Sequence, residues 1–243
     1  MKNVLAQAHV PESGFGKWFL RSNTWTNYVL EIALEDLTKL LNSNQESFNV
    51  IADVGCGYGR SLKKLNDRFN PKKLIAIDID PDMIEATKKE VALEKINNVD
   101  YVCCSSSMID LEDNSVDMLL CHQTFHHLIY QEQAISEFLR ILKPGGVLLF
   151  AESTKRYIHS FIIKLLFRHP MKVQKTADEY LTLVRDAGFY VADDKISYPF
   201  LWWSREDLAI KENWFGIAPP TEREETLINL IAQKPITSLD CNK

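Results

Sequence analysis

The decisive stretch of this chain is VIADVGCGYGR, residues 50–60. It joins an apolar run to a helical pattern through Gly55, Gly57 and Gly59, three of only nine glycines in the sequence. Glycine has no Cβ, so it accepts a positive φ and lets a ligand lie against the backbone. A strand that ends in such a loop and continues as a helix predicts a small-molecule site at the carboxyl edge of an α/β sheet.

Asp53 stands at the end of that strand, directly before the glycines. A carboxylate there would repel a pyrophosphate and would attract a ligand that carries an ammonium group. The dinucleotide fingerprint G-x-G-x-x-G also places its third glycine one position later than Gly59. The loop therefore favours a cofactor with a cationic part over a dinucleotide. A glycine turn that only closes a strand–helix unit is the alternative.

Strands and helices alternate on both sides of the loop. We expect strands at 49–53, 73–79, 101–104, 116–121, 147–151 and 190–198, and helices at 25–41, 60–68, 81–95 and 132–142. Most of the strands are continuous apolar runs, which is typical of a parallel sheet buried on both faces. Repeated strand–helix units predict an α/β fold with a doubly wound, mostly parallel sheet and helices on both faces.

The composition is that of one ordinary globular domain, with 46% apolar and 25% charged residues among 243. A formal net charge of −5 argues against a nucleic-acid partner, because such domains usually carry a basic excess. The five cysteines include no C-x-x-C pair, so neither a disulfide framework nor a zinc site is indicated. We therefore expect a reducing, cytoplasmic setting.

A second acid, Asp78, ends the next predicted strand, 19 residues after Gly59. A carboxylate at the sheet edge beside the glycine loop can accept hydrogen bonds from both hydroxyls of a ribose. Asp78 therefore indicates a nucleoside without choosing among nucleoside cofactors. Asp80 is instead expected to cap the helix that begins at Pro81.

Four segments, taken in order, resemble the motifs of the class I S-adenosylmethionine-dependent methyltransferases. They are the glycine loop, the segment after the third strand, FHHL at 125–128 and LKPGGVLLF at 142–150. The resemblance covers residues 50–150 and fades outside that range. It implies a seven-stranded, Rossmann-like sheet and S-adenosyl-L-methionine as cofactor. It also implies that an N-terminal helix and late inserts close over the site as a lid.

The same resemblance implies which residues bind the cofactor. The expected set is Asp53, Gly55, Gly57, Gly59, Asp78, Ile79, Ser105, Ser106 and His122. The family's usual acid on the adenine side falls on Ser105, so this chain departs from the pattern there. A serine hydroxyl can still hydrogen-bond the adenine amino group, but it brings no charge.

Three residues near strand ends are candidates for catalysis: His126, His127 and Glu152. A general base is needed only if the acceptor must lose a proton, and histidine titrates near neutral pH. The alternative is that the two histidines cap a loop or pack beneath the cofactor. No metal is expected, because no third ligand stands at a suitable spacing.

The segment 153–177 contains six lysines and arginines and no acid. Apolar residues at helical spacing predict a basic amphipathic helix over 157–166. Such a helix can contact an anionic membrane, guard an anionic acceptor, or serve only as a lid. Aromatic residues gather before the first strand and after the sixth, and they could line an apolar chamber for the acceptor.

These observations predict one methyltransferase domain over 1–234, with core motifs at 50–152 and lid elements at 15–42 and 153–180. The tail at 235–243 is expected to be disordered. The predicted function is methyl transfer from S-adenosylmethionine to a small, aromatic or lipophilic acceptor. The alternatives are methylation of a membrane-associated quinone or lipid, cofactor binding without catalysis, and an NAD-dependent oxidoreductase.

Overall fold

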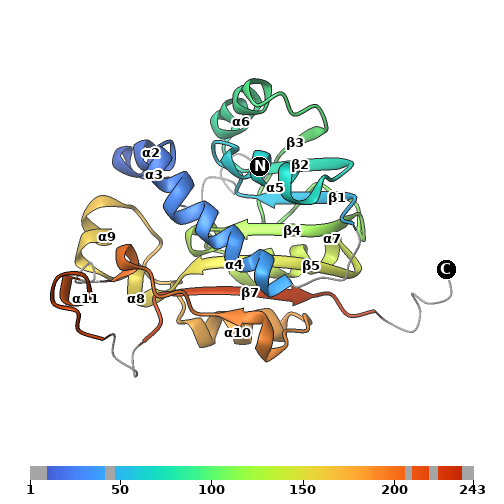
Figure 1. The fold of residues 1–243 in the computed structure, drawn as a ribbon. Helices are drawn as coiled ribbons and strands as arrows, with labels where there is room; N and C mark the ends of the chain where they lie inside the picture. Colours follow the sequence, from blue (N-terminus) through green and yellow to red (C-terminus); the bar gives the residue numbers. More distant parts are fainter. Residues whose placement is uncertain (1–9, 42–46, 206–209, 219–223, 237–243) are drawn as a thin grey trace.

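The computed structural model describes residues 10–41, 47–205, 210–218 and 224–236 (Figure 1). Its centre is a seven-stranded sheet with the order β3-β2-β1-β4-β5-β7-β6. The strands are β1 Val50–Val54, β2 Lys73–Asp78, β3 Val99–Cys103, β4 Val116–His122, β5 Leu142–Ser153, β6 Ile196–Ser197 and β7 Leu227–Gln233. The first five are parallel, and β7 runs antiparallel to both β5 and β6. The predicted seven-stranded, mostly parallel sheet is confirmed.

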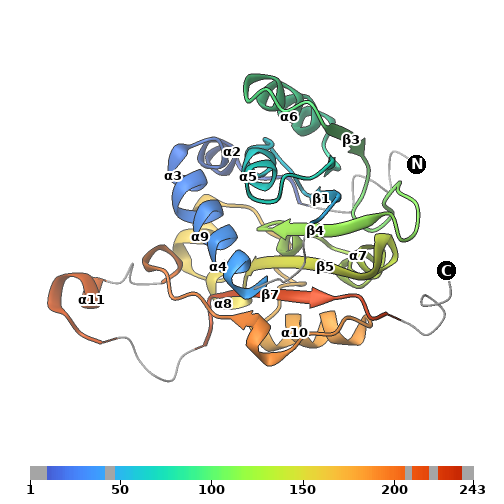
Figure 2. The same cartoon turned by 45° about the vertical axis from the view of Figure 1, so that its right-hand side comes forward.

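Helices cover both faces of this sheet (Figures 1 and 2). The longer ones are α4 Glu31–Leu41, α5 Arg60–Phe69, α6 Pro81–Leu93, α7 Gln131–Ile141 and α10 Ala177–Asp186. The short ones are α2 Gly14–Leu20, α3 Asn23–Trp25, α8 Lys155–Ile158, α9 Phe161–Leu166 and α11 Ile210–Phe215. Most of the short helices lie beyond the carboxyl ends of the parallel strands, and α11 projects away from the sheet.

Alternating side chains of the strands pack into two separate hydrophobic cores, one on each face of the sheet. Ile51 packs into the core shared with α4, α5 and α6, whereas Ala52 packs into the core shared with α7 and α10. In the second core, shared with α7 and α10, the ring of Phe125 lies 5.9 Å from that of Phe138 and 6.1 Å from that of Tyr180. Phe150 packs against both Phe125 and Tyr180. Burial of both faces explains why the central strands are largely continuous apolar runs.

One irregular turn interrupts the first long helix. Residues Thr26–Leu30 form a π-helical segment between α3 and α4, and the backbone N–H of Glu31 donates to the carbonyl of Thr26, five residues back. Such π-turns are rare and often occur beside functional sites. Here the turn follows Trp25, a residue that lines both cavities described below.

The strand expected at 147–151 is longer in the structure, Leu142–Ser153, and two other predicted elements differ in kind. The strand expected at 190–198 is only Ile196–Ser197, because the charged turn Asp193–Lys195 precedes it and Tyr190 forms an isolated bridge. Acidic residues fit poorly into strands, which explains the shortening. The helix expected at 157–166 is split into α8 and α9, since Ser160 has an extended backbone, φ −63° and ψ 152°, and begins a new helix.

Parts of two other predictions cannot be compared with the structure. Residues 237–243 of the expected tail and Asn42 of the first lid element lie outside the described residues. Within the described ranges, no helix combines the length and the apolar character needed to cross a bilayer.

The packing of the second core leads to a stability prediction. Phe138 on α7 is fully buried, and its ring contacts that of Phe125 at 5.9 Å. Phe138→Ala should lower the free energy of unfolding by about 3–5 kcal/mol, because it removes apolar contact and leaves a cavity. Urea unfolding followed by circular dichroism measures this. Leu93→Ala is the matched control, since Leu93 is 76% exposed and should cost less than about 0.5 kcal/mol.

Candidate functional site

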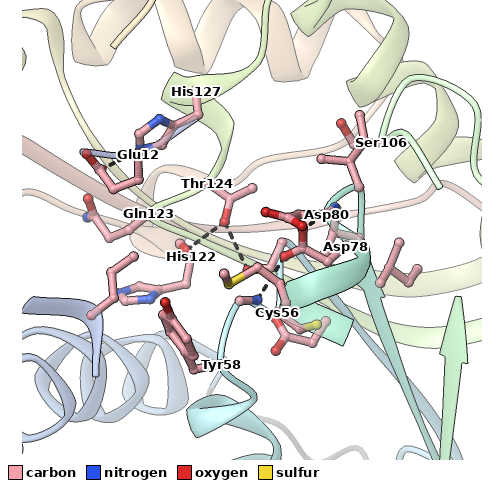
Figure 3. Close-up of a pocket in the computed structure, with 18 of the residues that line it drawn as sticks. Glu12, Cys56, Tyr58, Asp78, Asp80, Ser106, His122, Gln123, Thr124 and His127 are labelled. Atoms are coloured by element: carbon pink, nitrogen blue, oxygen red, sulfur yellow. Dashed lines mark hydrogen bonds and ion pairs between the residues drawn. The ribbon is translucent and has the colours of Figure 1, made fainter. Parts of the chain in front are cut away.

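A large cavity lies at the carboxyl ends of β1, β2 and β4, where the strand order reverses (Figure 3). Ligands of doubly wound sheets bind at this kind of position, because the connections diverge to opposite faces there. Of the nine predicted cofactor residues, eight line the cavity: Asp53, Gly55, Gly57, Asp78, Ile79, Ser105, Ser106 and His122. Gly59 does not line it. The fold therefore brings together residues that are up to 69 positions apart in sequence.

Glycine is required at the three loop positions for different structural reasons. All three have positive φ, between 54° and 75°. A Cβ on Gly55 would lie 2.2 Å from the Thr124 side chain, and one on Gly59 would lie 2.9 Å from that of Thr87. A Cβ on Gly57 would meet nothing closer than 4.0 Å. Gly55 and Gly59 are therefore needed for packing, whereas Gly57 leaves open space against the backbone where a ligand can lie.

Asp53 is a buried carboxyl group whose pKa is raised well above its ordinary value. Its side chain accepts a hydrogen bond from the hydroxyl of Ser61 and is 3% exposed. Burial raises the pKa of Asp53 to about 7; the Ser61 hydrogen bond opposes this shift and the charge of Asp78 adds to it. Within the described residues, no ion pair to Asp53 is found. A cationic ligand group would supply the missing charge.

Asp78 fastens the glycine loop to the neighbouring turn. One carboxylate oxygen accepts the N–H of Gly57 at 2.9 Å, and the other accepts the N–H of Asp80 at 2.9 Å. Asp78 also lines the first cavity, where a carboxylate can accept a hydrogen bond from a ligand hydroxyl. Asp80 caps α6 by accepting the N–H of Asp82 at 2.9 Å, which confirms its expected role as an N-cap.

Two serines, Ser105 and Ser106, line another side of the first cavity. Ser105 is buried, and its Oγ lies 2.8 Å from that of Ser107 and 3.3 Å from the Ser107 N–H. Ser106 is half-buried and also lines the cavity. This edge can hydrogen-bond a ligand through neutral groups, in contrast to the charged edge at Asp53 and Asp78.

The end of β4 contributes a buried imidazole. The Nε2 atom of His122 has no hydrogen-bond partner in the described structure, and the ring lies 5.5 Å from that of Trp25. Burial lowers the pKa of His122 to about 3, and nearby His126 adds to this effect. The next residue, Gln123, has a left-handed φ of 50°. An unpartnered polar atom and a strained backbone beside a cavity are both features of ligand sites.

A second cavity adjoins the first, and five residues line both: Glu12, Leu20, Trp25, Gln123 and His127. Figure 3 shows His127 beside Glu12 on the side of the first cavity opposite Asp78. The Nε2 atom of His127 lies 3.7 Å from a carboxylate oxygen of Glu12. Among the three predicted catalytic residues, His127 is the one that lines both cavities.

Glu152 lines neither of these cavities and instead shapes the turn after β4. It is fully buried, and one oxygen accepts the N–H groups of Thr124 and Phe125 at 2.8 and 2.7 Å. Its other oxygen lies 2.6 Å from Nδ1 of His126. A carboxylate with all of these partners is suited to position the turn and not to take a proton from a ligand.

The structure adds a third histidine that the sequence gave no reason to group with the first two. The ring of His169 lies 5.1 Å from that of His126 and 4.7 Å from that of His127. Burial lowers the pKa of His169 to about 3. His169 stands in the basic segment, 42 residues after His127, and no periodicity connects the two. Only the path of the chain around the second cavity brings them together.

The predicted lid elements contact one another at the rim of the second cavity. The ring of Phe167 packs edge-on against Phe15 and Phe19, and the hydroxyl of Ser13, just before the first lid element, donates to the carbonyl of Leu166 at 2.6 Å. The expected aromatic chamber is only partly formed. Phe19, Trp25 and Trp203 line the second cavity, whereas Trp18, Trp202 and Trp214 are at least half-exposed.

Comparisons with known proteins agree with this geometry. Residues 52–150 match the family model described as a methyltransferase domain. Malonyl-[acyl-carrier protein] O-methyltransferase of Marinomonas sp. is 25% identical over 74% of this chain. The ubiquinone/menaquinone biosynthesis C-methyltransferase of Campylobacter jejuni is 31% identical over 68% of this chain. The chain spans 66% of the length of either relative.

The fold also matches solved structures. A methyltransferase in complex with the Trm112 activator from Haloferax volcanii superposes with a TM-score of 0.69 over 92% of this chain and 96% of that one. At 19% sequence identity, this likeness concerns the fold alone. The match over 52–150, together with the strand order, identifies this part of the chain as a methyltransferase domain with the fold of the class I S-adenosylmethionine-dependent enzymes.

Proposed function

We propose that this protein transfers a methyl group from S-adenosylmethionine to a small, aromatic or lipophilic acceptor. The observation that carries the proposal is the pair of adjoining cavities, of which the first has charged and polar edges and the second has a largely apolar wall. The two relatives named above act on different acceptors, so the acceptor class is inferred from the second cavity and not from their names.

The first cavity fits the donor part by part. The Asp53 carboxylate suits the ammonium group of the methionine portion, and Asp78 suits the two ribose hydroxyls. The open backbone face of Gly57 allows the ligand to approach closely. Ser105 and Ser106 would hydrogen-bond the adenine, and His122 would use its unpartnered nitrogen near the same ligand. When bound, S-adenosylmethionine supplies a methyl group activated by a sulfonium charge.

The second cavity suits a lipophilic acceptor. Its wall includes Val29, Ile158, Ile163 and Phe167 beside the aromatic residues named above. Loss of hydration raises the pKa of Tyr157 well above its usual range, so its hydroxyl stays protonated and can donate to an acceptor oxygen. Apolar walls with a few polar groups are typical of small-molecule sites. Such a site contributes mainly by orienting the acceptor and excluding water.

In the metal-free protein, His127 is the residue best placed to take a proton if the acceptor must lose one. It lines both cavities, so it borders the passage between donor and acceptor. His126 and Glu152 are assigned to positioning, because their polar atoms are bonded to each other and to the turn.

A membrane-associated quinone or lipid is a second candidate acceptor, and the surface of α9 favours it. Phe161 is 80% exposed and Leu165 is 70% exposed, although both are large apolar residues. Trp18 on α2 is 59% exposed, and the cations Lys164 and Arg168 are exposed in the same segment. Apolar side chains with lysine and arginine beside them are the features by which short helices bind anionic membranes.

Methyl transfer is tested directly with S-adenosylmethionine labelled in the methyl group and an extract of small molecules. We expect label in a product that partitions into organic solvent. Asp78→Asn should weaken cofactor binding by about 1–3 kcal/mol, because ribose hydroxyls lose a charged acceptor. Asp82→Asn, which alters an exposed acid on the same turn, is the control. Calorimetric binding of NADH without binding of S-adenosylmethionine would contradict the proposal.

Because the pKa of Asp53 is raised, removing its charge should have opposite effects on protein stability and on cofactor binding. Its pKa in the fold, about 7, lies above the ordinary 3.8, so folding favours the protonated form. The contribution of Asp53 to the free energy of unfolding is fully present below about pH 4 and is lost as the pH rises through about 7. Asp53→Asn should therefore make the ligand-free protein more stable at pH 8, by roughly 1–3 kcal/mol, with little change at pH 4. The same variant should bind S-adenosylmethionine more weakly.

Urea unfolding at the two pH values, followed by calorimetry, measures both effects of Asp53→Asn. Glu112→Gln, which removes an exposed acid far from the cavity, should change neither quantity. Equal stability of Asp53→Asn and wild type at pH 8 would show that the buried carboxylate carries no such cost.

Membrane contact is tested by flotation with vesicles of phosphatidylcholine, with and without phosphatidylserine. We expect flotation only with the anionic vesicles, and we expect salt to reduce it. The double variant Phe161→Ser and Leu165→Ser should lose most of the binding. Leu93→Ser, an equally drastic change at a residue exposed on α6, should retain it. Absence of flotation by the wild type would reject the membrane-associated acceptor.

A further inference from the structure

We propose that His126, His127 and His169 bind a divalent transition-metal ion at the rim of the second cavity, with Zn²⁺ as the ion of best fit. One ligand atom from each of the three side chains lies within 4.8 Å of the other two. A zinc–nitrogen bond is about 2.0–2.1 Å, so nitrogens around a tetrahedral ion stand roughly 3.4 Å apart. Small side-chain rotations therefore suffice to close the site.

The first ligand, His126, is already held as metal-binding histidines usually are. Its Nδ1 lies 2.6 Å from Glu152, and a carboxylate accepts hydrogen bonds, so Nδ1 carries the proton and Nε2 is left to bind an ion. Glu152 is itself fixed by the N–H groups of Thr124 and Phe125. The backbone carbonyl of His126 accepts from the side chain of Gln174 at 2.8 Å. The orientation of this imidazole is therefore set before any ion binds.

Glu12 lies beside the second histidine, although the close group of ligand atoms contains the three histidines alone among the described residues. One of its oxygens lies 3.7 Å from Nε2 of His127. The other accepts the backbone N–H groups of Ser13 at 2.6 Å and of Arg168 at 3.2 Å, which fixes the carboxylate. A Cβ on Gly16 would lie 2.3 Å from the Glu12 side chain, so glycine there makes room for it.

Three imidazoles with a carboxylate next to one of them suit a borderline metal ion. Nitrogen and carboxylate ligands are those that Zn²⁺ takes in proteins, and a single negative charge offsets part of the charge of the ion. All four residues line the second cavity, so a further coordination position would open into it. If the proposed methyl transfer holds, that position would bind an oxygen of the acceptor. The metal site itself does not depend on that step.

A bound ion would also tie the lid elements to the sheet. Glu12 precedes α2, His169 follows α9, and the other two histidines stand in the turn after β4. One ion would thus join three segments that are otherwise held by a few hydrogen bonds and ring contacts. Binding should therefore stabilise the protein, because the unfolded chain offers no such site.

The test is a titration of the chelator-treated, full-length protein with Co²⁺, whose visible absorption reports tetrahedral coordination. Affinity for Zn²⁺ is then measured by competition with a chromophoric chelator. We expect one ion per chain and a rise in the unfolding temperature. His169→Ala should weaken binding at least about tenfold, and Glu152→Gln, which removes the partner of His126, by about 10–100-fold.

Two controls separate the site from other ligands. His159→Ala removes a histidine of the same basic segment outside the cluster, and Cys103→Ser removes an exposed thiol; both should bind as wild type. Calorimetry with S-adenosylmethionine should give the same affinity for His169→Ala and wild type, so failure of the metal site is distinguished from failure of the donor site. No cobalt absorption in the wild type, or equal affinity in His169→Ala, would overturn the proposal.

Discussion

The buried carboxylate of Glu152 links the sheet to both cavities through the turn that it holds after β4. Its hydrogen bonds to Thr124 and Phe125 place the Thr124 side chain against Gly55, where no Cβ would fit. Its contact with His126 orients the imidazole cluster on the other side. A single acid at the end of β5 thus fixes the position of the glycine loop relative to the histidines, although it lines neither cavity.

The lining of the first cavity was largely predictable, because its residues stand at the ends of neighbouring parallel strands. Gly57 and Asp78 are 21 positions apart, yet the strand–helix pattern alone predicts that they meet at one edge. The rim of the second cavity was not predictable in this way. Glu12 and His169 come from segments without strand periodicity, and their neighbours are decided by how short helices pack. The Asp193–Lys195 turn shows the same limit, since its charges ended a strand that the apolar pattern extended.

The two cavities are built from different parts of the chain. The first cavity is built largely from backbone groups and short acids on the β1–α5 and β2–α6 connections, within the range that matches the methyltransferase family model. The second cavity is built mostly from side chains of α2, α3, α9 and the segments around them, which lie outside that range, and Gln123, His126 and His127 are its lining residues inside the range. This division agrees with the partial coverage of relatives that act on different acceptors.

The π-turn at Thr26–Leu30 sets the rotational phase between two parts of one helix. A turn closed five residues back holds one residue more than an α-helical turn, which corresponds to about 100° of rotation around the axis. Leu34 and Leu37 can therefore keep their face against the sheet while Trp25 lines the two cavities. The angular offset allows one continuous helix to satisfy two surfaces, and it makes helix length there a determinant of cavity shape.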